Sequence, residues 1–343
     1  MALEAPRKNI VIVGTSVLMS SLHTCTSQHK ANPSSSFTGG GIIGCTTAYF
    51  LTRHPLYSPA THKITILEAT SIAAGASGKA GGLLALWAYP ACIVPLSYRL
   101  HEELAKEHDG AKRWGYRQIY CGSVDCTGKV RERKGGKGVV ADGEGREWNK
   151  LPKTKGGSIK KGRGDVPSDL DWLDGDTVKE YSVMGTPDTT AQVHPLLFTT
   201  SMADLAVSSG ASIVLGKVTS INSSSSSVQS VTYTEKATQE VKTLEATDVI
   251  ISAGPWTSKV FPAAPIEAMR AHSVVIKAEV APYAIFSEIA LPKGFNRTGG
   301  QGVETRRHGL SVSPEMYARP DGTVYACGMC CVLSSHSTYG ELG

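Results

Sequence analysis

The chain has 343 residues, 41% of them hydrophobic and 19% charged, a composition typical of globular proteins that excludes wholesale disorder. Its net charge of +5 is local, because residues 128–163 carry twelve Lys and Arg against four Asp and Glu. This Gly-rich tract predicts a solvated basic loop. Trp148 is its only aromatic residue, so it does not favour a nucleic-acid surface.

Targeting signals are not recognisable in the sequence. No apolar run has the length of a membrane helix, the first residues lack a secretory signal, and the end is not a peroxisomal address. We therefore expect a cytoplasmic protein without integral membrane contact. The eight cysteines are too few for a disulfide scaffold, and the pair Cys327 and Cys330 lacks a second ligand pair. No metal site is expected.

The N-terminal part predicts a strand followed by an interruption. An apolar run at residues 9–13 indicates a buried parallel strand ending at Gly14. Residues 15–38 are rich in Ser and Thr and show no helical period. Their removal would join Val13-Gly14 to Gly39-Gly40-Gly41 and give an unbroken strand, glycine turn and helix. Our hypothesis is that residues 15–38 are a non-native insert, translated from intron sequence.

A glycine turn at residues 39–41 comes next and opens a helix. Ile43, Thr47, Phe50 and Leu51 share one face of this helix, which we expect to be its apolar, core-facing side. The spacing Gly39-x-Gly41-x-x-Gly44 is the dinucleotide fingerprint, in which glycines permit a tight turn and close approach of the backbone to a pyrophosphate. The alternative is a glycine-rich turn without a ligand.

A second buried strand at residues 63–67 ends at Glu68. A carboxylate there can accept hydrogen bonds from ribose hydroxyls, which supports the dinucleotide interpretation. Leucines spaced by four then predict a helix over 96–108, and Phe198, Met202 and Leu205 predict another over 195–207. Further strands are expected from residue 212, around the serine turn 223–227, at 249–252 and in short runs over 273–333.

Three segments together resemble one enzyme family. The Gly- and Ala-rich stretch 69–84 is similar to the segment with which D-amino-acid oxidase, glycine oxidase and sarcosine oxidase relatives cover FAD. Val193-His194-Pro195 and the later Gly216–Ile221 resemble the adenine-side unit of that family, and Val249–Trp256 its strand and turn near the cofactor. The resemblance is to the fungal cytosolic branch of the D-amino-acid oxidase (DAO) superfamily. The cofactor-binding residues it implies are Gly39, Gly41, Gly44, Glu68, Ser77, Gly78, Gly81, Gly82, Leu83, Val218, Ala253, Gly254 and Trp256.

The resemblance implies oxidation of a C–N bond in a small amine or amino acid by hydride transfer to FAD, with oxygen as the final acceptor. A substrate carboxylate would need a cation, for which the candidates are Arg270 and Arg319. Tyr317 and His272 are candidates for orienting the amine. Each of the four could equally be an ordinary surface side chain.

Two alternatives remain open. An NAD(P)-dependent dehydrogenase would not need the small-residue stretch 73–84 after Glu68. A non-catalytic member with a trafficking or scaffolding role is the other alternative, because relatives continue past the segment 319–322 and the C-terminal part is expected to be incomplete. The predicted oligomeric state stays open.

The predicted architecture is α/β, with a Rossmann-like parallel sheet and an interleaved, strand-rich substrate domain. We expect the FAD-binding domain at residues 1–90 and 190–262, and the substrate domain at 91–189 and 263–343.

Overall fold

The computed structural model describes residues 8–13, 39–129, 166–266, 271–292 and 311–328. Two compact units are formed by alternating stretches of the chain. Unit 1 comprises Met1–Ala80, Glu107–Trp114 and His194–Arg270, and unit 2 comprises Gly81–Lys106, Gly115–Val193 and Ala271–Gly343. The insert at 15–38, most of the basic tract 128–163 and the C-terminal tail lie outside the described residues.

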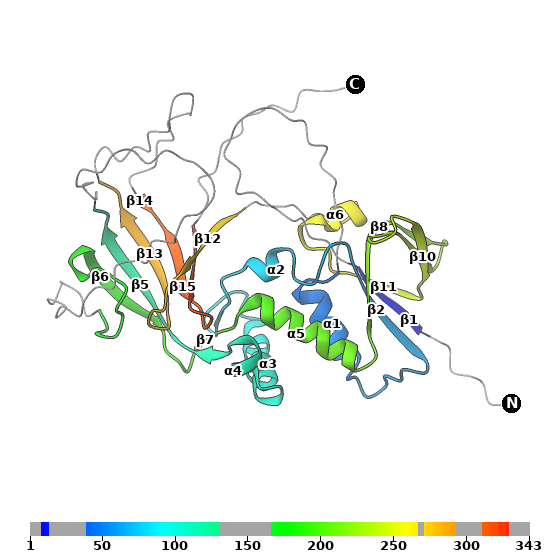
Figure 1. The fold of residues 1–343 in the computed structure, drawn as a ribbon, viewed down its shortest axis with the longest axis horizontal. Helices are drawn as coiled ribbons and strands as arrows, with labels where there is room; N and C mark the ends of the chain where they lie inside the picture. Colours follow the sequence, from blue (N-terminus) through cyan, green and yellow to red (C-terminus); the bar gives the residue numbers. More distant parts are fainter. Residues whose placement is uncertain (1–7, 14–38, 130–165, 267–270, 293–310, 329–343) are drawn as a thin grey trace, which may run out of the picture. The chain divides into compact units, whose positions relative to one another are not determined.

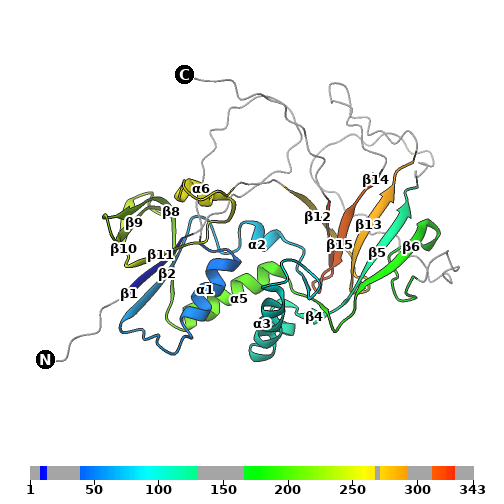
Figure 2. The same cartoon turned by 180° about the vertical axis from the view of Figure 1, so that it is seen from behind.

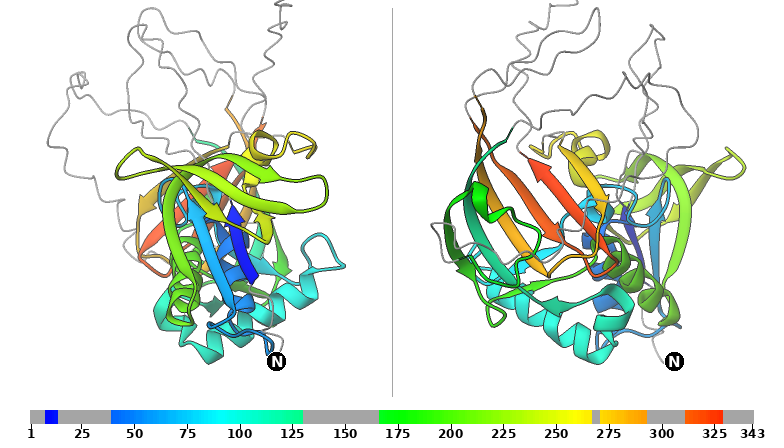
Figure 3. Two further views of the ribbon diagram at one scale, coloured as in Figure 1. Left: turned by 90° about the vertical axis from the view of Figure 1, so that its right-hand side faces the viewer. Right: turned by 60° about the vertical axis from the view of Figure 1, so that its left-hand side comes forward.

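Unit 1 is built on a six-stranded sheet with the order β10-β9-β8-β2-β1-β11 (Figure 1). The four strands from β8 to β11 in this order are parallel, and their register places Val13 beside both Leu67 and Ile251 and Glu68 beside Leu215. The carboxyl ends of these strands therefore meet at one edge. Strand β8 continues into an antiparallel hairpin with β9 and β10 (Figure 3, left). The strands are β1 Lys8–Val13, β2 His62–Glu68, β8 Ser212–Ser223, β9 Val228–Glu235, β10 Val241–Glu245 and β11 Asp248–Ile251.

Helices α1 (Ile42–Leu51) and α5 (Pro195–Ser208) lie side by side in both opposite views (Figures 1 and 2). The central strands β1 and β2 are buried toward their carboxyl ends, with Ile12 and Ile66 both 0% exposed, which explains their continuous apolar runs. The strands predicted at 9–13, 63–67, from 212 and at 249–252 are confirmed, as are the helix after the glycine turn and the helix at 195–207. Shorter elements of unit 1 are α2 Ala76–Lys79, α4 Gly110–Trp114, η2 Gly254–Trp256 and α6 Thr257–Val260.

The predicted apolar face of α1 is wrong. Ile43 is 64% exposed and Phe50 43% exposed, whereas Gly44, Cys45 and Ala48 are buried. Small side chains allow the helix backbone to approach its neighbours closely, and that close packing outweighs the burial of the larger residues. Tyr49 completes the buried side.

Unit 2 contains a larger sheet with the order β12-β16-β15-β13-β5-β6, with β14 paired to β13, and a small sheet β3-β7-β4 (Figure 3, right). Tyr317, Tyr325 and Ile119 pack on one face of the large sheet, and Tyr283, Ile285 and Leu170 on the other. The strands and helices are β3 Leu83–Ala85, α3 Val94–Glu107, β4 Arg117–Gln118, β5 Tyr120–Thr127, η1 Gly175–Thr177, β6 Val178–Gly185, β7 Thr190–Gln192, β12 His272–Lys277, β13 Tyr283–Ala290, β14 Ser311–Val312, β15 Pro314–Ala318 and β16 Thr323–Gly328.

The predicted fold class is confirmed, since a parallel α/β sheet is combined with a second unit rich in antiparallel strands. None of the described helices has the length and apolar character needed to cross a membrane.

Candidate functional site

The glycine turn of unit 1 is fastened to the end of β2. The Gly39 amide donates to the Leu67 carbonyl at 2.8 Å, and the Gly40 amide donates to Oε2 of Glu68 at 2.8 Å. A Cβ atom on Gly44 would overlap the Gly39 carbonyl oxygen, and one on Gly40 would lie 2.6 Å from Glu68 Oε2. The close packing against the backbone therefore requires glycine at position 44, whereas a Cβ at position 40 would displace the Glu68 carboxylate.

The N-terminus of α1 opens directly from this turn. Its N-cap, Gly41, supplies no side-chain hydrogen bond, and the first turn contains no acidic residue. Ser77 provides one acceptor, because the Ile42 amide donates to its Oγ at 2.9 Å. The positive end of the helix dipole is thus not neutralised by an acid of the helix itself, which suits an anion such as a diphosphate.

Glu68 is 0% exposed and forms the link between the turn and the following loop. Besides the Gly40 amide, its carboxylate accepts hydrogen bonds from the amides of Thr70 (2.9 Å) and Ser71 (3.2 Å) and from the Thr70 hydroxyl (3.0 Å). Several donors to one carboxylate compensate for its removal from water. The predicted acid and the predicted glycines are brought together at the carboxyl edge of the sheet.

The small-residue stretch after Glu68 folds back onto the glycine turn. The Ala73 amide donates to the Gly40 carbonyl at 2.7 Å, with Ala73 at a φ of 58°. A Cβ atom on Gly78 would overlap the Ala73 carbonyl. Gly78 and Ser77 therefore belong to the same closely packed assembly as the fingerprint glycines.

A buried thiol lies on the inner side of α1. Burial raises the pKa of Cys45 to about 12, and the nearby carboxylates of Glu68 and Asp204 act in the same direction. The thiol is consequently neutral at physiological pH and acts as a small apolar side chain.

The later cofactor candidates of unit 1 take separate positions along the sheet. Ser252 joins the ends of β11 and β1, because its amide donates to the Val13 carbonyl at 2.5 Å. Ala253 after it is 0% exposed, and Gly254 has a φ of 52° with open space where a Cβ would point. Trp256 ends the short helix η2. Val218 on β8 is 3% exposed and borders a hollow of about 250 Å³ lined also by Lys217, Thr219, Ser220, Lys259 and Val260.

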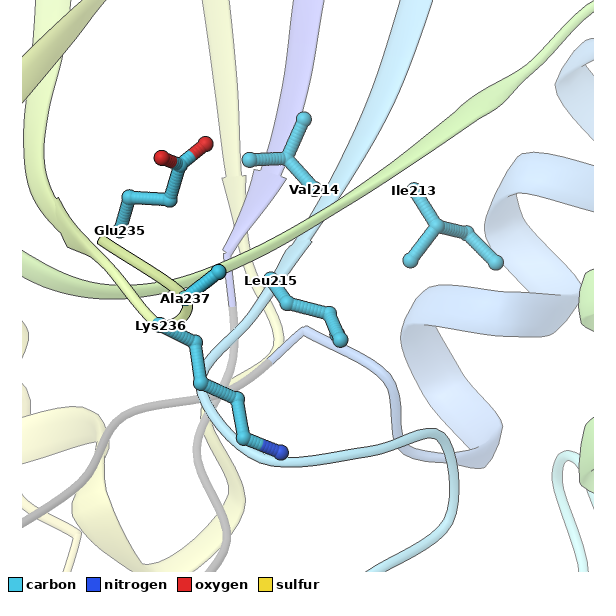
Figure 4. A pocket seen from close by; sticks show the side chains of 6 residues that line it. All are labelled: Ile213, Val214, Leu215, Glu235, Lys236 and Ala237. Carbon is cyan, nitrogen blue, oxygen red and sulfur yellow. The ribbon is translucent and has the colours of Figure 1, made fainter. Parts of the chain in front are cut away.

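Lys236 was not anticipated from the sequence. It lies beside an open hollow of about 490 Å³ where β8 and the end of β9 meet (Figure 4). Its Nζ donates to the Thr70 carbonyl at 2.7 Å, so it fastens the loop after Glu68 to the hairpin. No sequence signal marks it, because the contact joins residues 166 positions apart. The hollow is lined by Ile213, Val214, Leu215, Glu235, Lys236 and Ala237.

In unit 2, the segment 81–83 lies against an aromatic surface. A Cβ atom on Gly81 would overlap the ring of Tyr317, and Gly82 has a φ of 91°. The Gly82 carbonyl accepts from the Val193 amide at 3.0 Å, and Leu83 begins β3. Three predicted cofactor residues, Gly81, Gly82 and Leu83, therefore adjoin a predicted substrate residue.

The substrate candidates divide into two groups. Tyr317 is 5% exposed and donates its hydroxyl proton to Glu315, and its ring stacks on that of Tyr325. The guanidinium of Arg319 lies 4.7 Å from the centroid of Tyr325, and burial lowers its pKa below the usual range. His272 is exposed on β12, and Arg270 lies outside the described residues.

A family model for FAD-dependent oxidoreductases, named DAO, matches residues 38–330 of the chain. The chain belongs to the DAO family. It is therefore an oxidoreductase whose cofactor is FAD, and neither the nicotinamide alternative nor the scaffolding alternative is retained. The residues of unit 1 fit this cofactor, because a helix N-terminus without an acid in its first turn, glycines packed closely against the backbone and a buried acid occur at one sheet edge.

Two fungal relatives of this DAO protein carry oxidoreductase names. TDA3 of Saccharomyces cerevisiae is 33% identical, over 84% of this chain and 72% of the relative. A protein of Schizosaccharomyces pombe is 29% identical, over 84% of this chain and 68% of the relative. Among solved structures, glycine oxidase from Bacillus cereus superposes with a TM-score of 0.54 at 16% identity, over 94% of this chain and 72% of that chain. At that identity the likeness shows the fold.

A second polar group of the DAO protein also escaped prediction. Arg117 on β4 donates from Nε and Nη2 to Oε1 of Gln192 at 3.2 and 3.1 Å, and from Nη2 to the Ala318 carbonyl at 2.9 Å. Gln192 is 0% exposed on β7, directly opposite Leu83. The sequence offers no signal for a contact between an arginine and a glutamine 75 positions apart.

Proposed function

We propose that this DAO-family enzyme oxidises the C–N bond of a small amine or amino acid and that oxygen is its final electron acceptor. The supporting observation is the packing of Gly81 against Tyr317 within unit 2, with Arg319 two residues further along the same chain segment. A backbone segment without side chains adjoins aromatic and cationic groups there. Such an arrangement suits a flat ring and a small polar substrate.

FAD, when bound, would supply the hydride acceptor and the route of the two electrons to oxygen, whose reduced product is hydrogen peroxide. The substrate carbon loses a hydride and its nitrogen loses a proton, so that an imine forms and water hydrolyses it to a carbonyl compound and ammonia or an amine. The protein contributes binding, orientation and exclusion of water from the reacting groups.

Tyr317 is suited to receive the amine. Its single hydroxyl proton is donated to Glu315, so the lone pairs of the phenol oxygen remain available as acceptors for a substrate N–H. Burial and the hydrogen bond to Glu315 raise the pKa of Tyr317 far above its ordinary value, so the phenol stays protonated. We propose that Tyr317 orients the amine and that Arg319 binds a substrate carboxylate.

In unit 1, we propose that the amides at the start of α1 bind the FAD diphosphate and that Glu68 accepts from its ribose. Gly41 and Ser77 shape this end of the helix. The roles of His272 and Arg270 stay predictions.

The test uses the FAD-loaded protein with a panel of primary amines, secondary amines and amino acids, and measures peroxide together with oxygen consumption. We expect at least one substrate to yield peroxide in proportion to oxygen consumed. Tyr317→Phe should reduce kcat/KM for it about tenfold, the effect of one lost hydrogen bond to a polar substrate. Tyr120→Phe, on the exposed part of β5, is the matched control. A flavin-loaded protein inactive on the whole panel, or equal effects of the two variants, would contradict the proposal.

A further inference from the structure

Gln192 is a buried amide whose orientation is set by a neighbouring charge. Its Oε1 accepts two N–H groups of Arg117, at 3.2 and 3.1 Å. A guanidinium has no acceptor, so the reverse orientation would bring the amide N–H groups against N–H groups. The amide oxygen is therefore held toward Arg117, and the amide nitrogen must point elsewhere.

The amide nitrogen of Gln192 has no acceptor among the described residues, although the side chain is 0% exposed. Buried donors without a partner are rare in folded proteins, because leaving one unsatisfied costs the free energy of its hydration. Such a group calls for an explanation, and a bound ligand or a trapped water can each supply the missing acceptor.

The position of Gln192 favours a ligand. In the small sheet, Leu83, Gln192 and Arg117 are direct cross-strand neighbours, so their side chains share one face. Arg117 also reaches the Ala318 carbonyl, between Tyr317 and Arg319. The next residue along the chain, Val193, donates to the Gly82 carbonyl. The unsatisfied nitrogen thus belongs to the same part of unit 2 as the segment 81–83, Tyr317 and Arg319.

We propose that Gln192 donates a hydrogen bond from Nε2 to an acceptor oxygen of a bound ligand, and that Arg117 is the positioning residue that fixes the amide for this purpose. The inference rests on the proposed function. The acceptor is a carbonyl oxygen of the flavin ring or a carboxylate oxygen of the substrate, which present the same chemistry to an N–H donor.

Gln192→Glu is the decisive variant. It keeps an oxygen for Arg117 and replaces the amide donor by a second acceptor, so that the contact with the ligand becomes repulsive. Gln118→Glu is the matched control, because it makes the same chemical change at an exposed position of the same small sheet. Both variants are compared with wild type for unfolding of the FAD-free protein, for the FAD dissociation constant and for the flavin absorbance change on titration with acetate.

We expect Gln192→Glu to raise at least one of the two dissociation constants about tenfold or more, while the unfolding midpoint of the FAD-free protein does not fall. A change in the FAD constant identifies the flavin as acceptor, and a change in the acetate constant alone identifies the substrate. Gln118→Glu should leave both within about twofold of wild type. Arg117→Met, which releases the amide, should weaken the same ligand, and should have little further effect in the Gln192→Glu background.

Two results would overturn the proposal. If both dissociation constants of Gln192→Glu stay within twofold of wild type, the amide contacts no ligand. If the FAD-free variant loses stability in step with its affinity, the amide has a structural role only. Neither readout depends on turnover, so a failure of the proposed amine oxidation, seen as an absence of peroxide with normal FAD and acetate binding, is distinguishable.

Discussion

At the scale of single residues, the glycine turn and Glu68 form one hydrogen-bonded group. Gly40 is joined to Glu68 by its amide and to Ala73 by its carbonyl, so the turn is held on both sides. Gly44 lies one helical turn later, where its lack of a side chain allows contact with the Gly39 carbonyl. Each of these contacts depends on a particular residue type, and each can be tested by one substitution.

Gly44→Ala should destabilise the protein by about 2 kcal/mol, because the added methyl group overlaps the backbone of Gly39 and the turn must shift. Thermal or urea unfolding measures the effect. Gly328→Ala is the control, since the nearest atom to its Cβ is 3.9 Å away. Equal stability of the two variants would show that the turn is not closely packed.

Glu68→Gln tests the donors that converge on the acid. An amide offers one oxygen where the carboxylate offers two, and its NH2 group would face the amide of Gly40 or those of Thr70 and Ser71. We expect a loss of stability of about 2 kcal/mol and a weaker affinity for FAD. An FAD titration that gives the wild-type dissociation constant would refute a role for this acid in the site.

At the scale of elements, the glycine turn, α1 and β2 could be predicted from the sequence because they are consecutive and each carries a local signal. The buried face of α1 could not. Helical periodicity of large residues pointed to Ile43 and Phe50, whereas close packing selected Gly44, Cys45 and Ala48. The periodicity of large apolar residues indicates which face is hydrophobic. It carries no information on the distance between two packed backbones.

Long-range polar pairs were equally beyond prediction. Lys236 with Thr70 and Arg117 with Gln192 depend on strand register and on side-chain direction. Of the substrate candidates, Tyr317 and Arg319 were placed near one another because they are two residues apart on one chain segment. The candidate residues of the site came from the family resemblance. Their hydrogen-bond partners are visible only in the structure.

Helix α3 provides a pH-dependent test. Burial lowers the pKa of His101 from 6.5 to about 4. In the unfolded chain His101 therefore binds a proton near pH 6.5, whereas in the folded chain it binds one only near pH 4. The contribution of His101 to the free energy of unfolding is fully present above pH 6.5. It is lost as the pH falls toward 4, by roughly 3 kcal/mol in total.

Urea unfolding of wild type and His101→Phe between pH 7 and 4 measures this contribution. The difference in slope between the two proteins should appear below about pH 6.5 and should vanish above it. Parallel pH profiles of wild type and His101→Phe would show that the folded protein accepts the proton as readily as the unfolded chain.

At the scale of the whole molecule, the chain alternates between two units. Unit 1 carries the fingerprint glycines, Glu68 and the parallel sheet, and unit 2 carries the segment 81–83 with Tyr317 and Arg319. The DAO family match spans residues 38–330 and so covers both. This assignment makes FAD binding the property on which every chemical proposal depends.

The most direct measurement of that property is the flavin content of the purified full chain after incubation with excess FAD and removal of the free cofactor. The predicted result is a yellow protein with close to one FAD per chain, released on denaturation, and a markedly lower content in Gly44→Ala and Glu68→Gln preparations that remain folded by circular dichroism. A folded wild-type protein that retains no flavin, or variants that retain as much as wild type, would contradict the assignment of the site to these residues.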